Sequence, residues 1–147
     1  MKISEVMTRE VRIAGPDTTL ADAARTMAEL DAGVLPVANS ERLIGMVTDR
    51  DIVIRGLAEG LGPDARVAEV MTEDVKYCYE DDDCADVARN MGEIQIRRLP
   101  VVNRDKRLVG IVSIGDLAVT MGPEGEAIGD SLAGISRPNG AAEPRAL

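Results

Sequence analysis

The sequence predicts an α+β fold in which two β-α-β-β-α repeats pack against each other with pseudo-two-fold symmetry. The first observation is an internal repeat: "EVMT" occurs at 5–8 and 69–72, and "LPV" at 35–37 and 99–101. The second is an apolar stripe with helical spacing in each copy, and the third is a pair of short apolar runs that follows it. Each copy alone is too small to bury a comfortable core, so we expect the two copies to pack together.

The elements are expected in the same order in both copies. A helical turn over "ISEVMT" or "VAEVMT" opens each copy, and a short strand follows around 11–13 or 75–78. After the main helix, "VLPVA" and "LIGMV" form the strands of one hairpin, and "RLPVV" and "LVGIV" those of the other. A last helix is expected over about 49–60 and 114–121, and it ends at sequences rich in glycine and proline.

The main helix is predicted over roughly 19–32 in the first copy and 83–93 in the second. Thr19 and Asp83 stand directly before the two apolar stripes, and an acidic residue follows each of them three positions later. This spacing is typical of a capped helix N-terminus.

The two cysteines are interpreted as small buried hydrophobes. Cys84 stands in the second stripe where Leu20 stands in the first, and Cys78 lies in the strand-like run "VKYCY". Their spacing, in a chain without histidine, matches neither a metal site nor a redox pair. Together with the absence of a signal peptide at the start of the sequence, this predicts a cytoplasmic protein with reduced thiols.

The repeats define the expected domains. We place the first repeat at 1–62 and the second at 65–122, followed by a tail at 123–147. In the tail, "GEAIGDSLAGIS" is compatible with one or two helical turns, whereas "RPNGAAEPRAL" has the composition of a loose end. We therefore expect the tail to be partly flexible.

Composition excludes several functions. A net charge of −9 argues against binding to nucleic acid polymers and to anionic membranes, and no apolar run is long enough to span a bilayer. Without histidine, zinc sites and Ser/His or Cys/His catalysis are not expected. The acidic run at 80–83 could attract Mg²⁺, but it precedes a helix start, where acids are common. We therefore predict no metal and no enzymatic activity.

The motif with the most chemistry is repeated: "GMVTDRD" at 45–51 and "GIVSIGD" at 110–116. Its simplest interpretation is a capping box. The hydroxyl would accept the backbone amide of the aspartate, and the aspartate carboxylate would accept the backbone amide of the hydroxyl residue. A ligand site is the alternative. A glycine inside an apolar strand often marks close approach by another group, and a helix N-terminus with a nearby hydroxyl suits a phosphate. The two roles are compatible.

Over residues 1–122 the chain resembles a tandem pair of CBS domains, the Bateman module, and in particular the small stand-alone CBS-pair proteins of bacteria. The resemblance rests on "EVMT", "LPV" and the glycine-led motif, each present in both copies and in the same order. It implies adenine nucleotides bound in clefts between the repeats, with the hydroxyl on phosphate and the Asp on ribose. The base would lie against the early strand of the other repeat. It also implies a homodimer.

On this resemblance we expect two unequal nucleotide sites. The first comprises Met46, Thr48 and Asp51, with Lys76 from the second repeat closing it. The second comprises Ile111, Ser113 and Asp116, with Arg12 and Ile13 from the first repeat closing it.

Basic residues are expected to favour the second site. Arg97 and Arg98 precede its "LPVV", where the first repeat has an uncharged pair. Arginine suits phosphate, and we expect Arg98 to be the anchor, although both side chains could instead pair with surface acids. Neighbouring strand residues point to opposite faces, so the two arginines need not serve one site. Thr8 and Thr72 either lie near the nucleotide base or are simple polar residues at helix ends.

The predicted function is a non-catalytic regulatory module that binds AMP, ADP or ATP, with no obligatory cofactor. Ligand binding would shift the relative orientation of the repeats, and an effector protein would read that change. NAD and S-adenosylmethionine remain open as ligands. The alternative is a ligand-free structural or protein-interaction dimer.

Overall fold

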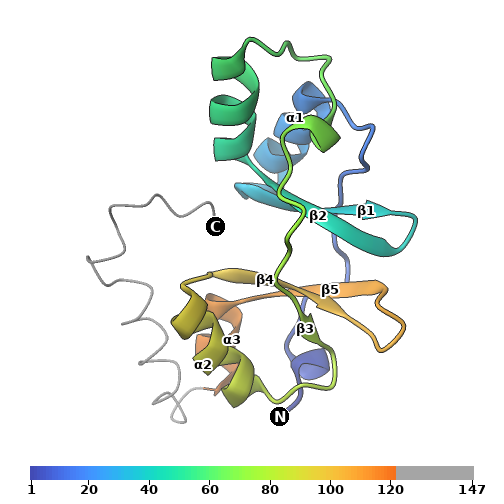
Figure 1. The fold of residues 1–147 in the computed structure, drawn as a ribbon. Helices are drawn as coiled ribbons and strands as arrows, with labels where there is room; N and C mark the ends of the chain where they lie inside the picture. The colour runs from blue at the N-terminus through green and yellow to red at the C-terminus, as the bar shows by residue number, and fades with distance from the viewer. Residues whose placement is uncertain (122–147) are drawn as a thin grey trace. The chain divides into compact units, whose positions relative to one another are not determined.

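The computed structural model describes residues 1–121, so the predicted tail at 123–147 lies outside the described residues. The chain divides into two compact units (Figure 1). Among the described residues, the first unit is Arg12–Val75, and the second combines Met1–Val11 with the chain from Lys76 to Met121. The units therefore exchange their opening segments relative to the sequence repeats. The predicted domain limits, 1–62 and 65–122, describe the repeats along the chain and stay a prediction. The two compact units have different limits.

The first unit contains an antiparallel strand pair covered by one main helix. Its elements in chain order are α1 (Leu20–Leu30), β1 (Val34–Asn39), β2 (Arg42–Thr48), the π-helix η2 (Asp51–Gly56), and the 3-10 turns η3 (Leu57–Glu59) and η4 (Val67–Glu69). The predicted apolar stripe is the buried face of α1. The buried core consists of Ala14, Leu20, Ala23, Met27, Leu35, Val37, Val47, Val67 and Val70.

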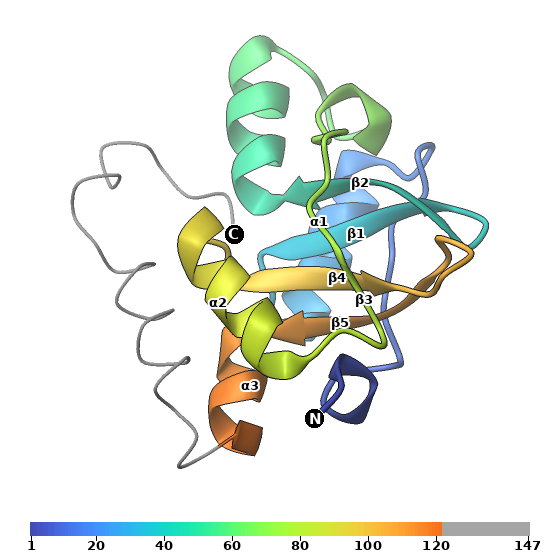
Figure 2. The same ribbon diagram turned by 60° about the horizontal axis from the view of Figure 1, so that its bottom comes forward.

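The second unit contains a three-stranded sheet in the order β3-β4-β5. Its elements in chain order are the 3-10 turn η1 (Ile3–Glu5), β3 (Cys78–Tyr79), α2 (Cys84–Ile94), β4 (Arg98–Val102), β5 (Leu108–Ser113) and α3 (Ile114–Met121). Helices α2 and α3 both contribute to the core on one face of this sheet (Figure 2). The buried core consists of Ile3, Met7, Cys78, Cys84, Val87, Ala88, Met91, Leu99, Val101, Val112, Ile114 and Leu117.

The "EVMT" segments explain the exchange, because each adds to a strand edge of the unit it joins. Thr8 and Ile111 exchange both backbone hydrogen bonds, at 2.9 and 3.0 Å. Thr72 and Met46 do the same in the first unit, at 2.8 and 2.9 Å. We call each of these paired contacts a clasp. The repeated "EVMT" sequence is therefore an edge-pairing element rather than only the helical turn that was predicted.

Both main helices begin at the predicted caps. The Thr19 hydroxyl accepts the Asp22 amide at 3.1 Å, and an Asp83 carboxylate oxygen accepts the Ala85 amide at 3.2 Å. The α-helices start one residue later, at Leu20 and Cys84, so the side-chain oxygens satisfy amides that lack a partner within the helix.

The early strands are shorter than predicted. Residues 11–13 form no strand, and Ala14 makes a single parallel bridge to Val37 before Gly15 and Pro16 turn the chain. Proline has no amide to donate to a ladder, so the pairing stops there. In the second unit the strand is limited to β3, and residues 75–77 of the predicted strand form none. The Tyr79 amide donates to the Asp82 carboxylate at 2.9 Å where the chain turns away from the strand.

The last helix of the first repeat is also not the predicted α-helix. It widens into a π-helix over Asp51–Gly56 and ends in a 3-10 turn, whereas α3 in the second unit is a regular α-helix. The widened segment carries three consecutive β-branched residues at 52–54, which are poor α-helix formers. A Cβ on Gly56 would lie 2.9 Å from the Leu20 Cδ1 atom, so this glycine permits close packing on α1.

Candidate functional site

Both glycine-led motifs form complete capping boxes at a strand-to-helix turn. In the first unit the Thr48 amide donates to Asp51 Oδ2, and the Asp51 amide donates to Thr48 Oγ1, both at 3.0 Å. In the second unit the Ser113 amide donates to Asp116 Oδ2 at 3.1 Å, and the Asp116 amide donates to Ser113 Oγ at 3.0 Å. The capping interpretation is therefore correct for both motifs.

The second capping box leaves polar groups available. Ser113 and Asp116 are only partly buried. The Ser113 hydroxyl accepts one bond through its oxygen and can still donate its proton. The Asp116 Oδ1 atom makes no hydrogen bond or ion pair with the residues that the structure describes. One donor and one strong acceptor therefore remain at the start of α3, where the helix dipole favours an anion.

Arg98 lies across the strand pair from this box. In the register of β4 and β5, Arg98 is the direct partner of Ser113, so the two side chains share one face of the sheet. Arg97 precedes the strand and accepts the Ile114 amide through its carbonyl at 2.9 Å. Neither guanidinium forms an ion pair within residues 1–121. The structure therefore brings Arg98, but not Arg97, into register with the second motif.

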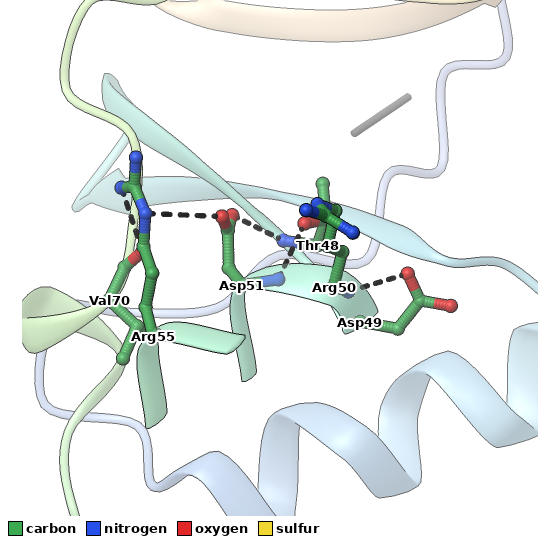
Figure 3. Close-up of polar contacts among 6 residues, drawn as sticks. All are labelled: Thr48, Asp49, Arg50, Asp51, Arg55 and Val70. Atoms are coloured by element: carbon green, nitrogen blue, oxygen red, sulfur yellow. Dashed lines mark hydrogen bonds and ion pairs between the residues drawn. The ribbon is translucent and has the colours of Figure 1, made fainter. Parts of the chain in front are cut away.

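The first capping box is more enclosed than the second, and Figure 3 shows its polar contacts. Thr48 is 3% exposed and Asp51 is 6% exposed. Arg55 Nε lies 3.8 Å from Asp51 Oδ1, and Arg55 Nη1 donates to the Val70 carbonyl at 3.4 Å. Asp49 stands beside the box with its carboxylate accepting the adjacent Arg50 amide at 2.8 Å. The Asp51 carboxylate is thus bonded on one oxygen and faced by a cation on the other.

The motif glycines are explained by the protein's own backbone. A Cβ on Gly45 would lie 2.9 Å from the Thr72 carbonyl oxygen, and a Cβ on Gly110 would lie 2.9 Å from the Thr8 carbonyl oxygen. The close approach that the sequence indicated is therefore made by the clasp. These glycines give no support to a ligand, which corrects one of the arguments for a nucleotide site.

The other predicted residues fall into two groups. Met46 and Ile111 carry the clasps with Thr72 and Thr8, so all four contribute main-chain atoms there. The residues expected to close each site belong to the unit that does not carry the corresponding motif, and their roles stay predictions. These residues are Lys76 for the first motif, and Arg12 and Ile13 for the second.

Sequence reasoning missed Arg55, although it stands four residues after Asp51, a spacing that places side chains together on a helix. It also missed a cluster at the far end of the sheet from Ser113. Lys106 Nζ donates to the Tyr77 hydroxyl at 2.7 Å, and the Arg104 guanidinium lies 4.0 Å from the centre of the Tyr79 ring. The hydrogen bond from Lys106 lowers the pKa of Tyr77.

The acidic run and the cysteines have structural roles. Asp81 accepts two hydrogen bonds from Arg104, which lower the pKa of Asp81, and Asp83 caps α2. Across residues 1–121 no three Cys, Asp or Glu side chains are grouped to hold a metal ion. Cys78 and Cys84 are free and buried, as expected, and burial raises the pKa of Cys78 to about 12.

The fold and its paired motifs define a family. The CBS domain model matches residues 3–57 and 67–121, and the chain belongs to the CBS-domain proteins with two such domains in tandem. Within the described part of the chain, no helix has both the length and the apolarity needed to cross a bilayer.

The relatives that match most of the chain include two bacterial proteins. CBS domain-containing protein YhcV of Bacillus subtilis is 37% identical over 93% of this chain and 96% of its own length. Hypoxic response protein 1 of Mycobacterium tuberculosis is 41% identical over 78% of this chain and 80% of its own length. The resemblance to small bacterial CBS-pair proteins, of which the mycobacterial hypoxic response protein is one, is confirmed.

The similar solved structures include the following three. Hypoxic response protein I with two coordinated zinc ions has a TM-score of 0.74 at 40% identity, covering 81% of this chain and 98% of that chain. CBSX2 in complex with AMP has a TM-score of 0.73 at 26% identity, covering 82% and 95%. The CBS domain pair of MJ0100, with 5′-methylthioadenosine and S-adenosyl-L-methionine, has a TM-score of 0.72 at 26% identity, covering 84% and 98%.

Proposed function

We propose that this protein is a non-catalytic regulatory module that binds an adenine nucleotide at the Ser113–Asp116 box. The observation that carries the proposal is that two hydrogen-bonding groups of this box, the Ser113 hydroxyl proton and Asp116 Oδ1, are not used within the box. The Ser113 hydroxyl can donate to a phosphate oxygen, and Asp116 Oδ1 can accept from a ribose hydroxyl. Arg98 stands in register beside them as a phosphate partner.

The similar structures support the class of ligand. CBSX2 binds AMP, and the MJ0100 pair binds two adenosine derivatives, 5′-methylthioadenosine and S-adenosyl-L-methionine. All three ligands share adenosine, and AMP adds the phosphate that would use Arg98. AMP, ADP and ATP are therefore the first candidates, and S-adenosylmethionine and NAD come next.

The test compares two neighbouring arginines. Arg98→Gln and Arg97→Gln remove the same charge, and neither side chain has an ion pair within residues 1–121 to lose. Thermal shift and calorimetric titration with AMP, ADP, ATP, NAD and S-adenosylmethionine should reveal a ligand for the wild type. At 100 times its dissociation constant that ligand should stabilise the fold by about 2.7 kcal/mol.

Arg98→Gln should weaken phosphate-containing ligands by about tenfold or more, which is the loss of one charge-assisted bond. Arg97→Gln should bind as the wild type does. Failure of every ligand to bind the wild type would contradict the proposal. It would favour the second candidate function, a ligand-free interaction protein.

We further propose that the protein acts as a homodimer, and that an effector protein reads the ligand-bound state. Large apolar side chains are exposed on the last helix of each repeat: Val53, Ile54 and Leu57 in the first, and Val119, which is 86% exposed, in the second. A second copy of the chain would remove such surface from water. Sedimentation equilibrium should give twice the monomer mass, and Val119→Asp with Ile54→Asp should reduce it.

A further inference from the structure

The two capping boxes differ in what their aspartates face. Asp51 Oδ1 faces Arg55 Nε at 3.8 Å, and Arg55 is held in place by its bond to the Val70 carbonyl. This arrangement is visible in Figure 3. A guanidinium supplies N–H donors on the side of the carboxylate where a ribose would supply O–H donors. In the second unit the position equivalent to Arg55 is Thr120, which carries no charge.

The residues around the boxes also differ in charge. The first box has a second carboxylate, Asp49, where the second box has Ile114, which is buried in the core. Gly33 and Val34 stand at the start of β1, and the two arginines occupy the equivalent positions at the start of β4. A phosphate at the first box would therefore meet no strand arginine. The charge of Asp49 is offset by its neighbour Arg50, so the missing strand arginines are the main electrostatic difference between the boxes.

The exposure of the two boxes also favours ligand binding at the second one. Thr48 and Asp51 are buried, whereas Ser113 and Asp116 are both partly exposed. A ligand hydroxyl can replace water at the second box without displacing a side chain of the box. At the first box it would have to replace Arg55 and reach a carboxylate that is already enclosed.

We propose that Arg55 takes the place of a ligand at the first box, so that the chain binds one adenine nucleotide, at the Ser113–Asp116 box only. This inference rests on the proposed function. It adds the number of nucleotides bound per chain and names Arg55 as the residue that determines this number. The first box then serves as a structural cap, and Arg55 is the residue that occupies the side of its aspartate which the second box leaves open.

The experiment counts bound ligand on the full chain with AMP as the probe and ATP as the second probe, by calorimetry and native mass spectrometry. The wild type should bind one AMP per chain. Asp116→Asn should abolish that binding, and Asp51→Asn should leave its affinity within about twofold. Arg55→Thr, which copies the second repeat, should add a second and weaker binding event. Arg25→Thr, which removes an exposed arginine paired with Asp22 on α1, should remain at one.

Two AMP molecules per wild-type chain, loss of binding in Asp51→Asn, or an unchanged count in Arg55→Thr would each overturn the inference. If neither AMP nor ATP binds the wild type, the proposed function fails instead. The closure by Arg55 is still tested in that case by amide hydrogen exchange without ligand. Arg55→Thr should then expose the Thr48 amide to faster exchange than in Arg25→Thr, with the Ser113 amide unchanged in both variants. Equal protection of Thr48 in the two variants would contradict the closure.

Discussion

The two Ser/Thr-x-x-Asp boxes have the same internal hydrogen bonds and different surroundings. In each, two bonds of 3.0–3.1 Å join the hydroxyl residue and the aspartate at the start of a helix. Beyond the box, the first has Arg55 and a second carboxylate, and the second has Arg98 and a carboxylate oxygen with no partner among residues 1–121. The motif therefore specifies the helix start, and the residues outside the motif decide which box can accept a ligand.

The same comparison applies to the clasps. Each unit places a motif glycine directly against a backbone carbonyl and a methionine of the exchanged segment. The contact is somewhat closer in the second unit, where a Cβ on Gly110 would lie 2.6 Å from the Met7 sulfur. The corresponding distance from Gly45 to the Met71 sulfur is 2.8 Å. Both clasps are therefore constrained by the same 2.9 Å backbone contact, and the methionine adds a closer contact in the second unit.

The largest expected effect comes from adding a methyl group at the motif glycine of each clasp. Gly110→Ala should lower the free energy of unfolding by about 3 kcal/mol, because the new methyl group meets backbone that cannot move freely. Gly45→Ala should cost somewhat less, because its backbone contact is the same and its methionine lies slightly farther away. Urea unfolding measures both. Gly62→Ala is the control, since nothing lies within 4 Å of its Cβ position, and it should change stability by less than about 0.5 kcal/mol. A neutral Gly110→Ala would show that the clasp is not tightly packed.

The next largest effect is a difference in stability between variants of the two capping boxes. Asp51→Ala should cost about 2–3 kcal/mol of unfolding free energy, because it leaves the enclosed Thr48 amide without its partner. Asp116→Ala should cost about 1 kcal/mol, because water can reach the partly exposed Ser113 amide. Urea unfolding of the two variants at neutral pH gives the difference. Equal costs would mean that the boxes are equally enclosed and would weaken the proposed division of roles.

The effect that is smallest at neutral pH concerns Cys78, whose counterpart in the first repeat is Ala14. Burial raises the pKa of this thiol from 9.0 to about 12, so the folded state holds the proton more tightly than the unfolded state does. Its contribution to stability is complete below pH 9 and is lost as the pH rises towards 12. The loss should not exceed about 1.4 kcal/mol per pH unit, the limit for one proton.

Cys78→Ala copies the first repeat and should flatten the alkaline part of the stability curve between pH 9 and pH 11, as measured by urea unfolding at several pH values. At pH 7 both proteins should show the same slope of stability with pH. An identical alkaline slope in wild type and variant would mean that the thiol titrates equally in the folded and unfolded states.

Much of the fold could be predicted because local patterns determine it. Thr19 and Asp83 mark the helix starts, the apolar stripes mark the buried faces, and the capping boxes follow from the spacing of hydroxyl and acid. These features depend on residues within a few positions of one another, so the sequence shows them directly.

The clasps could not be assigned in the same way. Both "EVMT" segments are identical, and either could pair with either glycine-led strand, so sequence alone does not say that Thr8 pairs with Ile111. The Arg55 contact was missed because its significance depends on the Val70 carbonyl, which the exchanged segment brings to it. The widened η2 helix was missed because a β-branched run lowers α-helix propensity without predicting a π-helix.

The pairing of Thr8 with Ile111 also constrains how the chain can acquire its structure during synthesis. Residues 1–11 leave the ribosome early, but the strand edge that they pair with is translated about a hundred residues later. Until then Ile3 and Met7, both buried in the finished protein, have no native core to enter. Nascent chains halted before Ser113 should therefore remain targets for chaperones, and the N-terminal segment should be among the last parts of the molecule to become protected.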